Sequence, residues 1–414
     1  MKYLVIIPDG IGDHASESLG GKTPLEVARI PNLSFFAQIG KVGTVRTVPD
    51  RMEPATHVAF GTLLGYEPKQ NAAGPGPLEA ANLEVKLEEN EIAFRLNLVT
   101  ESDGVLADET AGHITTREAK ALIAYLNKKL ASDFVRFFPS AGHRHIAVIK
   151  DARGFDALSA DCPEPGSIVG KPIEQNLPKG PGEDLIKKLI YDSQMLLRDH
   201  EINRVRLDLG ENPANMVWLW GQGCMPKLPK FLDRFGGLSG ATISTSEVVK
   251  GFSRLVGLTV VEQSSGHAFP DFDYEGQAQT MLDLIREKDF VCLHARACDE
   301  ASHEGHLKQK VLSLEAIDHH IIGAAKTFYE SYKDVRLLIA PLHNTPYHLR
   351  RHVRESVPFI LSGKNIVPDE LERFNEAAAQ LSQFRFRDGW KLIDQLFSAK
   401  ETSEVFQDAG FSRK

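Results

Sequence analysis

Three almost continuously apolar segments lie near the two ends of the chain, and each runs into a residue type that binds metal ions. The three junctions are KYLVIIP at Asp9, FVCLHARAC at Asp299 and VRLLIAPL at His343. Apolar runs of this kind are typical of strands that are buried on both faces of a parallel sheet. Because ligands bind outside the carboxyl ends of strands in open α/β sheets, we expect these three side chains to converge at one metal site.

The pattern of apolar and polar residues in the middle of the chain differs from the pattern near its ends. Residues 83–101 alternate apolar and polar side chains around a polar turn, as antiparallel strands do, and residues 117–131 have the spacing of an amphipathic helix. A stretch rich in Gly, Pro and Asn, KQNAAGPGP, marks the entry into this block. The sequence therefore predicts a mostly parallel α/β domain of residues 1–72 plus 236–414, interrupted by an inserted α+β domain of residues 73–235.

Bulk composition narrows the classes of function. The chain has 414 residues and a net charge of −8, which argues against a nucleic-acid surface but still allows a small anionic substrate held by local arginines. No segment approaches the ~20 apolar residues of a membrane-spanning helix, and no signal-like segment precedes the first strand. The four cysteines show no CxxC spacing. These features predict a cytoplasmic protein without nucleic-acid or membrane partners.

Asp299 and His303 form the strongest candidate pair of metal ligands. A spacing of four on a helical turn places both side chains on one face, where a carboxylate and an imidazole can chelate a divalent cation. Two further histidines, His343 and His352, follow the third apolar segment in LHNTPYHLRRH. The alternatives are a surface ion pair for the first two residues and solvent-facing loop histidines for the other two.

Thr56, in EPATHVAF, is a candidate nucleophile. A hydroxyl in the first turn of a helix faces free backbone N–H groups and the positive end of the helix dipole, so this position can receive a phosphate. Contact with a metal ion would favour the alkoxide form of the hydroxyl. The alternative is an ordinary threonine that caps a helix.

Arginines of the middle block are candidate ligands for an anion, because a guanidinium group binds phosphate or carboxylate through a planar fork. Arg95 and Arg144 lie inside apolar strand patterns and are better candidates than Arg204 and Arg206 in NRVRLDLG. The alternative for each arginine is a solvated position on the surface.

Several segments, spread over nearly the whole chain, resemble one known family. They are PDGIGD, GKTPLEVARIPNL, LLGYEP, GPGPLEAAN, AFRLNLVTESDG, NPANMVWLWGQG, DEASHEGH and HNTPYHLRRH. Together these segments are far more specific than any single motif. The chain resembles the archaeal-type cofactor-independent (2,3-bisphosphoglycerate-independent) phosphoglycerate mutases of the alkaline phosphatase superfamily.

The resemblance implies an alkaline-phosphatase-like domain that binds one or two divalent metal ions (Mn, Zn or Mg), and an inserted transferase-like domain that binds a small phosphorylated acid such as phosphoglycerate. In this family a hydroxyl nucleophile moves a phosphoryl group between the 3- and 2-hydroxyls of glycerate. The implied nucleophile here is Thr56. The implied ligands are Asp299, His303 and His352 for one ion, Asp9, Thr56 and His343 for the other, and Arg95, His113, Arg144 and Arg206 for phosphoglycerate.

The chain departs from the family pattern on the nucleophile side. Thr56 and His57 replace the usual Ser-Asp pair, and Leu342 replaces the acidic residue that usually precedes the histidine. Gln277 stands where the family usually has a lysine, which would help the transferring phosphoryl group. Each lost electrostatic contact of this kind can reduce the rate by about 10²–10³. Two further departures are Pro165-Gly166-Ser167 in place of a His-Asp pair and His306 in place of an acidic residue.

Three interpretations stay open at this point. The first is a divergent metal-dependent mutase that uses a threonine nucleophile, and the second is a phosphatase or phosphodiesterase that uses the same residue. The third is a catalytically degraded family member with a binding or assembly role, which the missing carboxylate at Leu342 and the missing charge at Gln277 favour. A homo-oligomer is compatible with all three.

Overall fold

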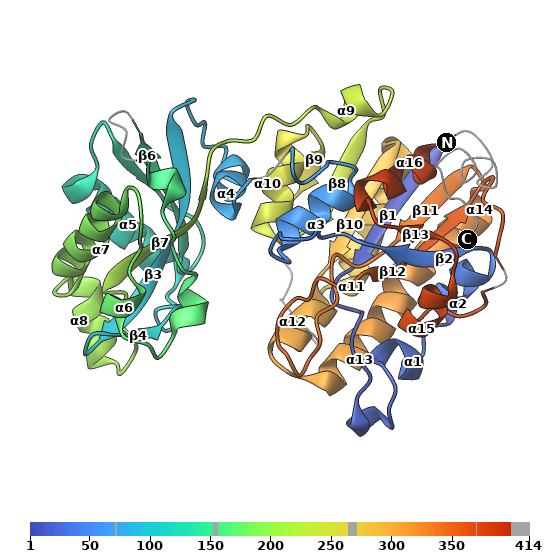
Figure 1. Ribbon diagram of the computed structural model, residues 1–414, viewed down its shortest axis with the longest axis horizontal. Helices are drawn as coiled ribbons and strands as arrows, with labels where there is room; N and C mark the ends of the chain where they lie inside the picture. Colours follow the sequence, from blue (N-terminus) through green and yellow to red (C-terminus); the bar gives the residue numbers. More distant parts are fainter. Residues whose placement is uncertain (71–72, 152–155, 264–270, 370, 399–414) are drawn as a thin grey trace. The chain divides into compact units, whose positions relative to one another are not determined.

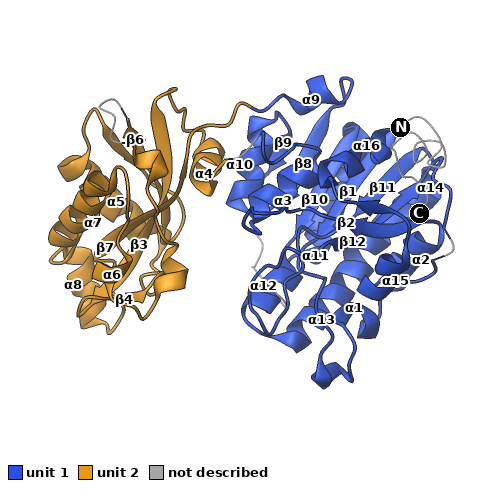
Figure 2. Ribbon diagram, in the orientation of Figure 1, with its two compact units in different colours: residues 1–72, 228–414 blue, residues 73–227 orange. Residues whose placement is uncertain are grey.

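The chain divides into two compact units (Figure 2), and each is described here by itself. The computed structural model describes residues 1–70, 73–151, 156–263, 271–369 and 371–398. Unit 1 consists of residues 1–72 and 228–414, and unit 2 consists of residues 73–227. The sequence predicts that the chain returns to the first unit at residue 236. The structure places this return at residue 228, so that α9 (Phe231–Arg234) belongs to unit 1.

Unit 1 is built on an eight-stranded sheet with the strand order β13-β2-β12-β11-β1-β10-β8-β9 (Figure 1). Strand β12 is antiparallel to both of its neighbours, and the other pairs of adjacent strands are parallel. The strands are β1 (Lys2–Pro8), β2 (Gly40–Val45), β8 (Gly240–Ser244), β9 (Thr259–Val261), β10 (Phe290–Ala295), β11 (Val335–Ile339), β12 (Val357–Gly363) and β13 (Arg385–Phe386).

Strand β1 shows why the apolar runs of the sequence form the centre of this sheet. Leu4 and Ile6 pack into the core on one face, and Val5 and Ile7 on the other face are just as inaccessible to solvent. Successive side chains of a strand point to opposite faces, so a central strand covered on both sides needs apolar residues at every position. Fully burying each of these side chains contributes about 1.5–3 kcal/mol.

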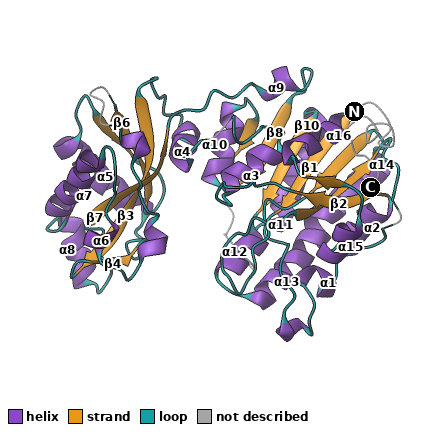
Figure 3. Cartoon of the chain, in the orientation of Figure 1, coloured by secondary structure: helices purple, strands orange, loops and turns teal. Residues whose placement is uncertain are grey.

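Helices cover both faces of the sheet of unit 1 (Figure 3). Two of them, α13 and α14, are joined by a π-helical segment at Ile317–Ile322, so the helix is continuous through this region but carries one wider turn. The helices are α1 (Pro24–Val27), α2 (Pro31–Gln38), α3 (Thr56–Leu63), α9 (Phe231–Arg234), α10 (Glu247–Leu255), α11 (Tyr274–Glu287), α12 (Ala297–His303), α13 (Leu307–Ala316), α14 (Gly323–Ser331), α15 (Glu376–Leu381) and α16 (Leu392–Phe397), with 3₁₀ turns at Glu17–Leu19 and Gly389–Lys391.

Unit 2 is an α+β unit with an antiparallel five-stranded sheet. Helix α5 begins at a capping box in which Thr115 and Glu118 satisfy each other's backbone N–H groups, and its apolar side chains pack on the sheet with those of α7. The strands are β3 (Glu91–Ser102), β4 (Val105–Asp108), β5 (Val135–Phe138), β6 (Arg144–Lys150) and β7 (Met216–Gly223). The helices are α4 (Pro75–Asn82), α5 (Thr116–Leu130), α6 (Ile173–Asn176), α7 (Glu183–Leu197) and α8 (Glu201–Asp208), with 3₁₀ turns at Ala157–Ser159 and Pro165–Ile168.

The predicted fold class is therefore confirmed: a mostly parallel α/β unit, and a second, antiparallel α+β unit whose sequence lies inside it. Within the described ranges, no helix is both long enough and apolar enough to span a bilayer.

Candidate metal centre

The register of the parallel strands brings the predicted metal ligands to one edge of the sheet of unit 1. Strand β1 lies between β10 and β11, so the residues that follow these three strands meet at their carboxyl ends. Gly10 allows the close approach, because its φ is +73° and a Cβ atom there would lie 2.4 Å from the Cα of Asp299. A side chain at residue 10 would push the end of β1 away from α12.

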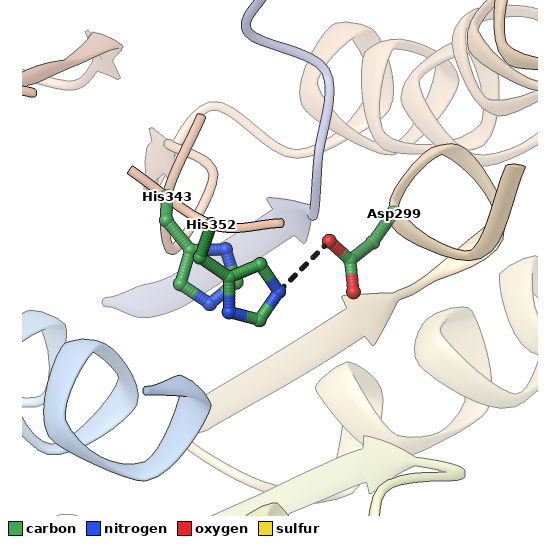
Figure 4. Close-up of side chains that lie close together, drawn as sticks. All are labelled: Asp299, His343 and His352. Carbon is green, nitrogen blue, oxygen red and sulfur yellow. Dashed lines mark hydrogen bonds and ion pairs between the residues drawn. The ribbon is translucent and has the colours of Figure 1, made fainter. Parts of the chain in front are cut away.

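Three ligand atoms from Asp299, His343 and His352 lie within 4.8 Å of one another (Figure 4). Nε2 of His352 is 3.2 Å from Oδ1 of Asp299, and the rings of His343 and His352 stack with their centroids 3.4 Å apart. One carboxylate and two imidazoles at this spacing form a donor set suited to a divalent transition metal such as zinc.

His303 completes the group. As its helical spacing from Asp299 predicts, its Nε2 lies 3.6 Å from Oδ1 of Asp299, and it lies only 3.0 Å from Nε2 of His352. The Nδ1 atom of His303 is 3.0 Å from the backbone oxygen of Arg350, and Nδ1 of His352 is 2.9 Å from that of Pro54. A carbonyl oxygen only accepts, so both Nδ1 atoms carry a proton. Burial lowers the pKa of His352, but the neighbouring Asp299 outweighs burial and raises it, which favours a second proton on Nε2 beside the carboxylate. A cation bound between the two Nε2 atoms and the carboxylate would take the place of that proton.

His343 is the most deeply buried of the three histidines. Neither ring nitrogen has a hydrogen-bond partner among the described residues, and Nδ1 lies 3.5 Å from Oδ1 of Asp9. Burial lowers its pKa to about 4, so the imidazole is neutral and both of its nitrogens lack the bonds they would have in water. The sequence-based resemblance assigns His343 to a different ion from His352, whereas the structure stacks the two rings.

Asp9 is held by three donors from three strand ends. Its Oδ1 accepts hydrogen bonds from the backbone N–H groups of Gly10 and Leu342, and its Oδ2 lies 3.1 Å from Nε2 of His294. Burial favours the protonated acid, but the nearby His343 and the hydrogen bond from His294 outweigh it and hold the pKa of Asp9 below its usual value. Leu342 thus donates to this carboxylate through its backbone, since its buried apolar side chain has no polar group to offer.

His294 is a residue that the sequence analysis missed. It lies in β10 with no exposed surface, and its Nδ1 is 2.9 Å from the hydroxyl of Ser244. The hydroxyl of Ser244 accepts a hydrogen bond from the N–H of Ser246 and donates its own proton to Nδ1 of His294. The ring proton of His294 therefore lies on Nε2, which donates to Asp9. The available signal was a histidine inside an otherwise apolar strand, FVCLHA.

A second missed group supports the other carboxylate. Thr345 donates its hydroxyl to Oδ1 of Asp299 at 2.7 Å. The fully buried ammonium of Lys310 donates to the backbone oxygen of Thr345 at 2.9 Å and to Oδ2 of Asp13 at 2.6 Å. This buried ion pair therefore ties α13 to the loops after β1 and β11, which carry the candidate ligands.

Thr56 is the first residue of α3 and is partly exposed. The hydrogen bond between His352 and the backbone oxygen of Pro54 holds the segment just before Thr56 against the metal ligands. The N-cap position is Ala55, which has no side chain to occupy the free N–H groups of the helix. Thr56 is therefore not the N-cap residue, which was the alternative role considered for it.

Comparisons with known proteins identify the family of this chain. A family model described as 2,3-bisphosphoglycerate-independent phosphoglycerate mutase matches residues 37–203. A protein of that name from Methanothrix thermoacetophila is 37% identical over 399 residues, which cover 96% of this chain and 100% of the relative. The chain belongs to the 2,3-bisphosphoglycerate-independent phosphoglycerate mutase family.

One further relative and two solved structures also match nearly the whole chain. A relative from Ignicoccus hospitalis is 31% identical, and the match covers 98% of this chain and 99% of the relative. The structure of a cofactor-independent phosphoglycerate mutase from Thermoplasma acidophilum superimposes with a TM-score of 0.62 at 23% identity, covering 96% of this chain and 99% of that one. A protein from Pyrococcus horikoshii superimposes with a TM-score of 0.76, also at 23% identity, over 96% and 98% of the two chains. These two structures show that the fold is shared.

The substrate ligands implied by the mutase resemblance all lie in unit 2, where two of them come close together. His113, in the turn after β4, and Arg144, at the start of β6, both lie near His143. Burial, and then the charges of these two neighbours, lower the pKa of His143 to about 4. Arg144 and His113 are exposed, as groups that bind a ligand must be.

The other two arginines of unit 2 are occupied by protein groups. Arg95 forms an ion pair with Glu79 and stacks over Trp220 at 4.7 Å. The guanidinium of Arg206 is buried and donates to Glu118 and to the backbone oxygens of Ala111 and Asn212. Arg206 thus has a structural role, and a role in substrate binding remains a prediction for both.

Gln277 and His306, two of the departures from the mutase family pattern, lie in different environments. The side chain of Gln277, on α11, is fully buried, and neither atom of its amide has a partner among the described residues. His306 is exposed and pairs with Glu304 and Gln309. Gln277 therefore places a neutral amide where the family pattern has the positive charge of a lysine. His306 lies on the surface.

Proposed function

We propose that this protein is a metal-dependent phosphoglycerate mutase that transfers the phosphoryl group of a small phospho-acid by way of Thr56. The facing Nε2 atoms of His303 and His352 beside the carboxylate of Asp299 carry the metal part of this proposal. Membership of the mutase family supports the phosphoglycerate part. The unpaired cysteines of the described chain fit a reducing cytoplasm.

In this proposal the hydroxyl of Thr56 attacks the phosphorus atom. A bond forms between Oγ and phosphorus while the bond from phosphorus to the 3-oxygen of the substrate breaks, and the proton lost by Thr56 is returned to that oxygen. Attack by the 2-hydroxyl then reverses these changes and frees Thr56. A divalent ion (Mn, Zn or Mg) held by Asp299, His303 and His352 would stabilise the charge on the phosphoryl oxygens.

A second ion, at Asp9 and His343, would be held less well. Asp9 and His343 lie together, but Leu342 supplies an apolar side chain where a carboxylate would help. Since each missing electrostatic contact reduces the rate by about 10²–10³, we expect a slow mutase. Unit 2, with His113 and Arg144, is proposed to hold the acid.

The test is turnover of 3-phosphoglycerate in a coupled assay with added manganese, using the Thr56→Ala variant as the control. Turnover above this control supports the mutase. Phosphate release without formation of 2-phosphoglycerate would instead identify a phosphatase.

Leu342 favours a second candidate, a binding protein that has kept one metal and lost catalysis. This candidate predicts no turnover, no phosphorylated Thr56, and a single ion per chain. Elemental analysis combined with anomalous scattering distinguishes the mutase from the binding protein. Two fully occupied metal sites near Thr56 would favour the mutase.

A further inference from the structure

We propose that a pocket in unit 1, lined by none of the candidate metal ligands, binds a small organic acid with two negatively charged groups. The cavity has a volume of about 620 Å³ and lies where β2, β12, β13 and α15 meet. This volume is in the range of sites for small molecules, about 300–1,000 Å³. The lining residues that carry the argument are Arg46, Arg385, Arg387, Pro358, Ala379 and Phe386.

Sheet register places the three arginines together. Arg385 pairs with Thr44 across the parallel strands β13 and β2, and the N–H of Arg46 donates to the backbone oxygen of Phe386. Thr44 and Arg385 therefore share one face of the sheet, and Arg46 and Arg387, each one residue beyond a strand end, line the same cavity. Phe386 alternates to the other side and packs against Phe359.

The carboxylates that line the same pocket already have partners. Asp13 is paired with the buried Lys310, and Glu376 accepts from the N–H of Asp13 and the hydroxyl of Thr23. Glu355, at the rim, pairs with His14 at 3.0 Å. None of these acids forms an ion pair with Arg46, Arg385 or Arg387 in the described structure, so the donor groups of the arginines stay available to a ligand.

Among the residues that the structure describes, none of the three arginines has a buried acidic partner. Arg46 forms an ion pair with Asp50 on the surface, and Arg385 donates to the backbone oxygens of Ser382 and Gln380. Arg387 makes no hydrogen bond or ion pair with any described residue. Two or three guanidinium groups at one cavity favour a ligand with two anionic groups, each held by a planar fork.

The apolar part of the wall indicates an organic ligand. Pro358 and Ala379 also line the cavity, and a bare inorganic ion would leave these apolar side chains in contact with water. A dicarboxylate or a phosphorylated carboxylic acid satisfies both parts of the wall.

The experiment is calorimetric titration of the full-length protein with malonate and succinate, and with acetate as the single-charge comparison, at constant ionic strength. Arg387→Gln is the main variant, because it removes no contact within the described structure. Arg286→Gln is the matched control, since this exposed arginine on α11 lies outside the pocket and meets only Asp283. We expect saturable binding of a dicarboxylate that weakens about tenfold in Arg387→Gln, stays unchanged in Arg286→Gln, and exceeds that of acetate about tenfold.

The same titration after removal of metal by chelation separates this proposal from the proposed mutase activity. Binding that persists in the metal-free protein and in Thr56→Ala places the acid in the arginine pocket, whether or not the protein turns over phosphoglycerate. Binding that is lost on chelation, equal binding by the two arginine variants, or no saturation up to about 10 mM would each overturn the proposal.

Discussion

The Nε2 atoms of His303 and His352 face each other at 3.0 Å, while a backbone carbonyl occupies the other nitrogen of each ring. Two neutral imidazoles do not settle in this arrangement by their own attraction. It is stable when a cation or a shared proton lies between them, and Asp299 beside them favours either.

The first prediction concerns metal content. His352→Gln should weaken metal binding at least about tenfold, because it removes a ligand and the contact to Pro54. His348→Gln is the matched control, since it changes an exposed histidine of the same loop. Elemental analysis after dialysis measures the effect, and full metal content in His352→Gln would contradict the assignment.

The second prediction concerns the carboxylate missing from the nucleophile side. Leu342→Asp should raise metal content toward two ions per chain, because a carboxylate at this position would join Asp9 and His343. Leu342→Asn has a similar shape without the charge and should leave the content unchanged. If both variants bind the same amount of metal, the charge at this position is not what limits the second ion.

The third prediction concerns the buried ion pair between Lys310 and Asp13. Lys310→Met leaves a buried carboxylate without its partner, so we expect the free energy of unfolding to fall by about 3–5 kcal/mol. Lys308→Met, on the exposed side of the same helix, should change it by less than about 0.5 kcal/mol. Urea unfolding measures both, and similar effects would show that the pair is not the stabilising element.

The fourth prediction concerns the buried amide of Gln277. Neither atom of this amide has a partner among the described residues, and an unsatisfied buried polar group costs about 1–3 kcal/mol. Gln277→Met should therefore stabilise unit 1, and thermal unfolding would show a higher midpoint. A lower midpoint would mean that a bound water or ligand satisfies the amide.

The fifth prediction concerns pH and unit 2. Burial lowers the pKa of His145 to about 3, below the value near 6.5 of an unfolded chain. The unfolded state therefore binds the proton more readily than the folded state. The contribution of neutral His145 to the free energy of unfolding is complete above pH 6.5 and is lost as the pH falls toward 3. Between pH 7 and 4.5 the loss from this residue is about 2–3 kcal/mol.

His145→Gln should make the stability of unit 2 less sensitive to pH, whereas His113→Gln, at an exposed position, should not. Hydrogen exchange of the amides of β6 at the two pH values reports on this unit alone. An unchanged pH dependence in His145→Gln would assign the effect to other groups.

Much of this fold could be predicted because its rules are local. Apolar runs at residues 2–8 and 335–342 marked buried strands, and the spacing of Asp299 and His303 marked one helix face. The role of His294 could not be predicted, because it depends on which hydroxyl and which carboxylate lie beside its two nitrogens. The same is true of Thr345 and Lys310, whose partners are far away in the sequence.

The structural role of Arg206 was equally hidden from the sequence. An arginine whose guanidinium donates to backbone oxygens and an arginine that binds a phosphate can occur in similar sequence patterns. The stacking of His343 on His352 also depends on the path of the loop between them, which no periodicity describes.

The parallel register at β1 has a consequence for the order of events during synthesis. Asp9 emerges early, but Asp299, His303, His343 and His352 follow only after all of unit 2 has been made. Lengthening the intervening chain adds little entropic penalty, about 0.6 kcal/mol for each doubling. The candidate centre therefore cannot assemble until residue 352 has left the ribosome, and tight metal uptake by a nascent chain would mark the moment at which the last of these ligands has joined unit 1.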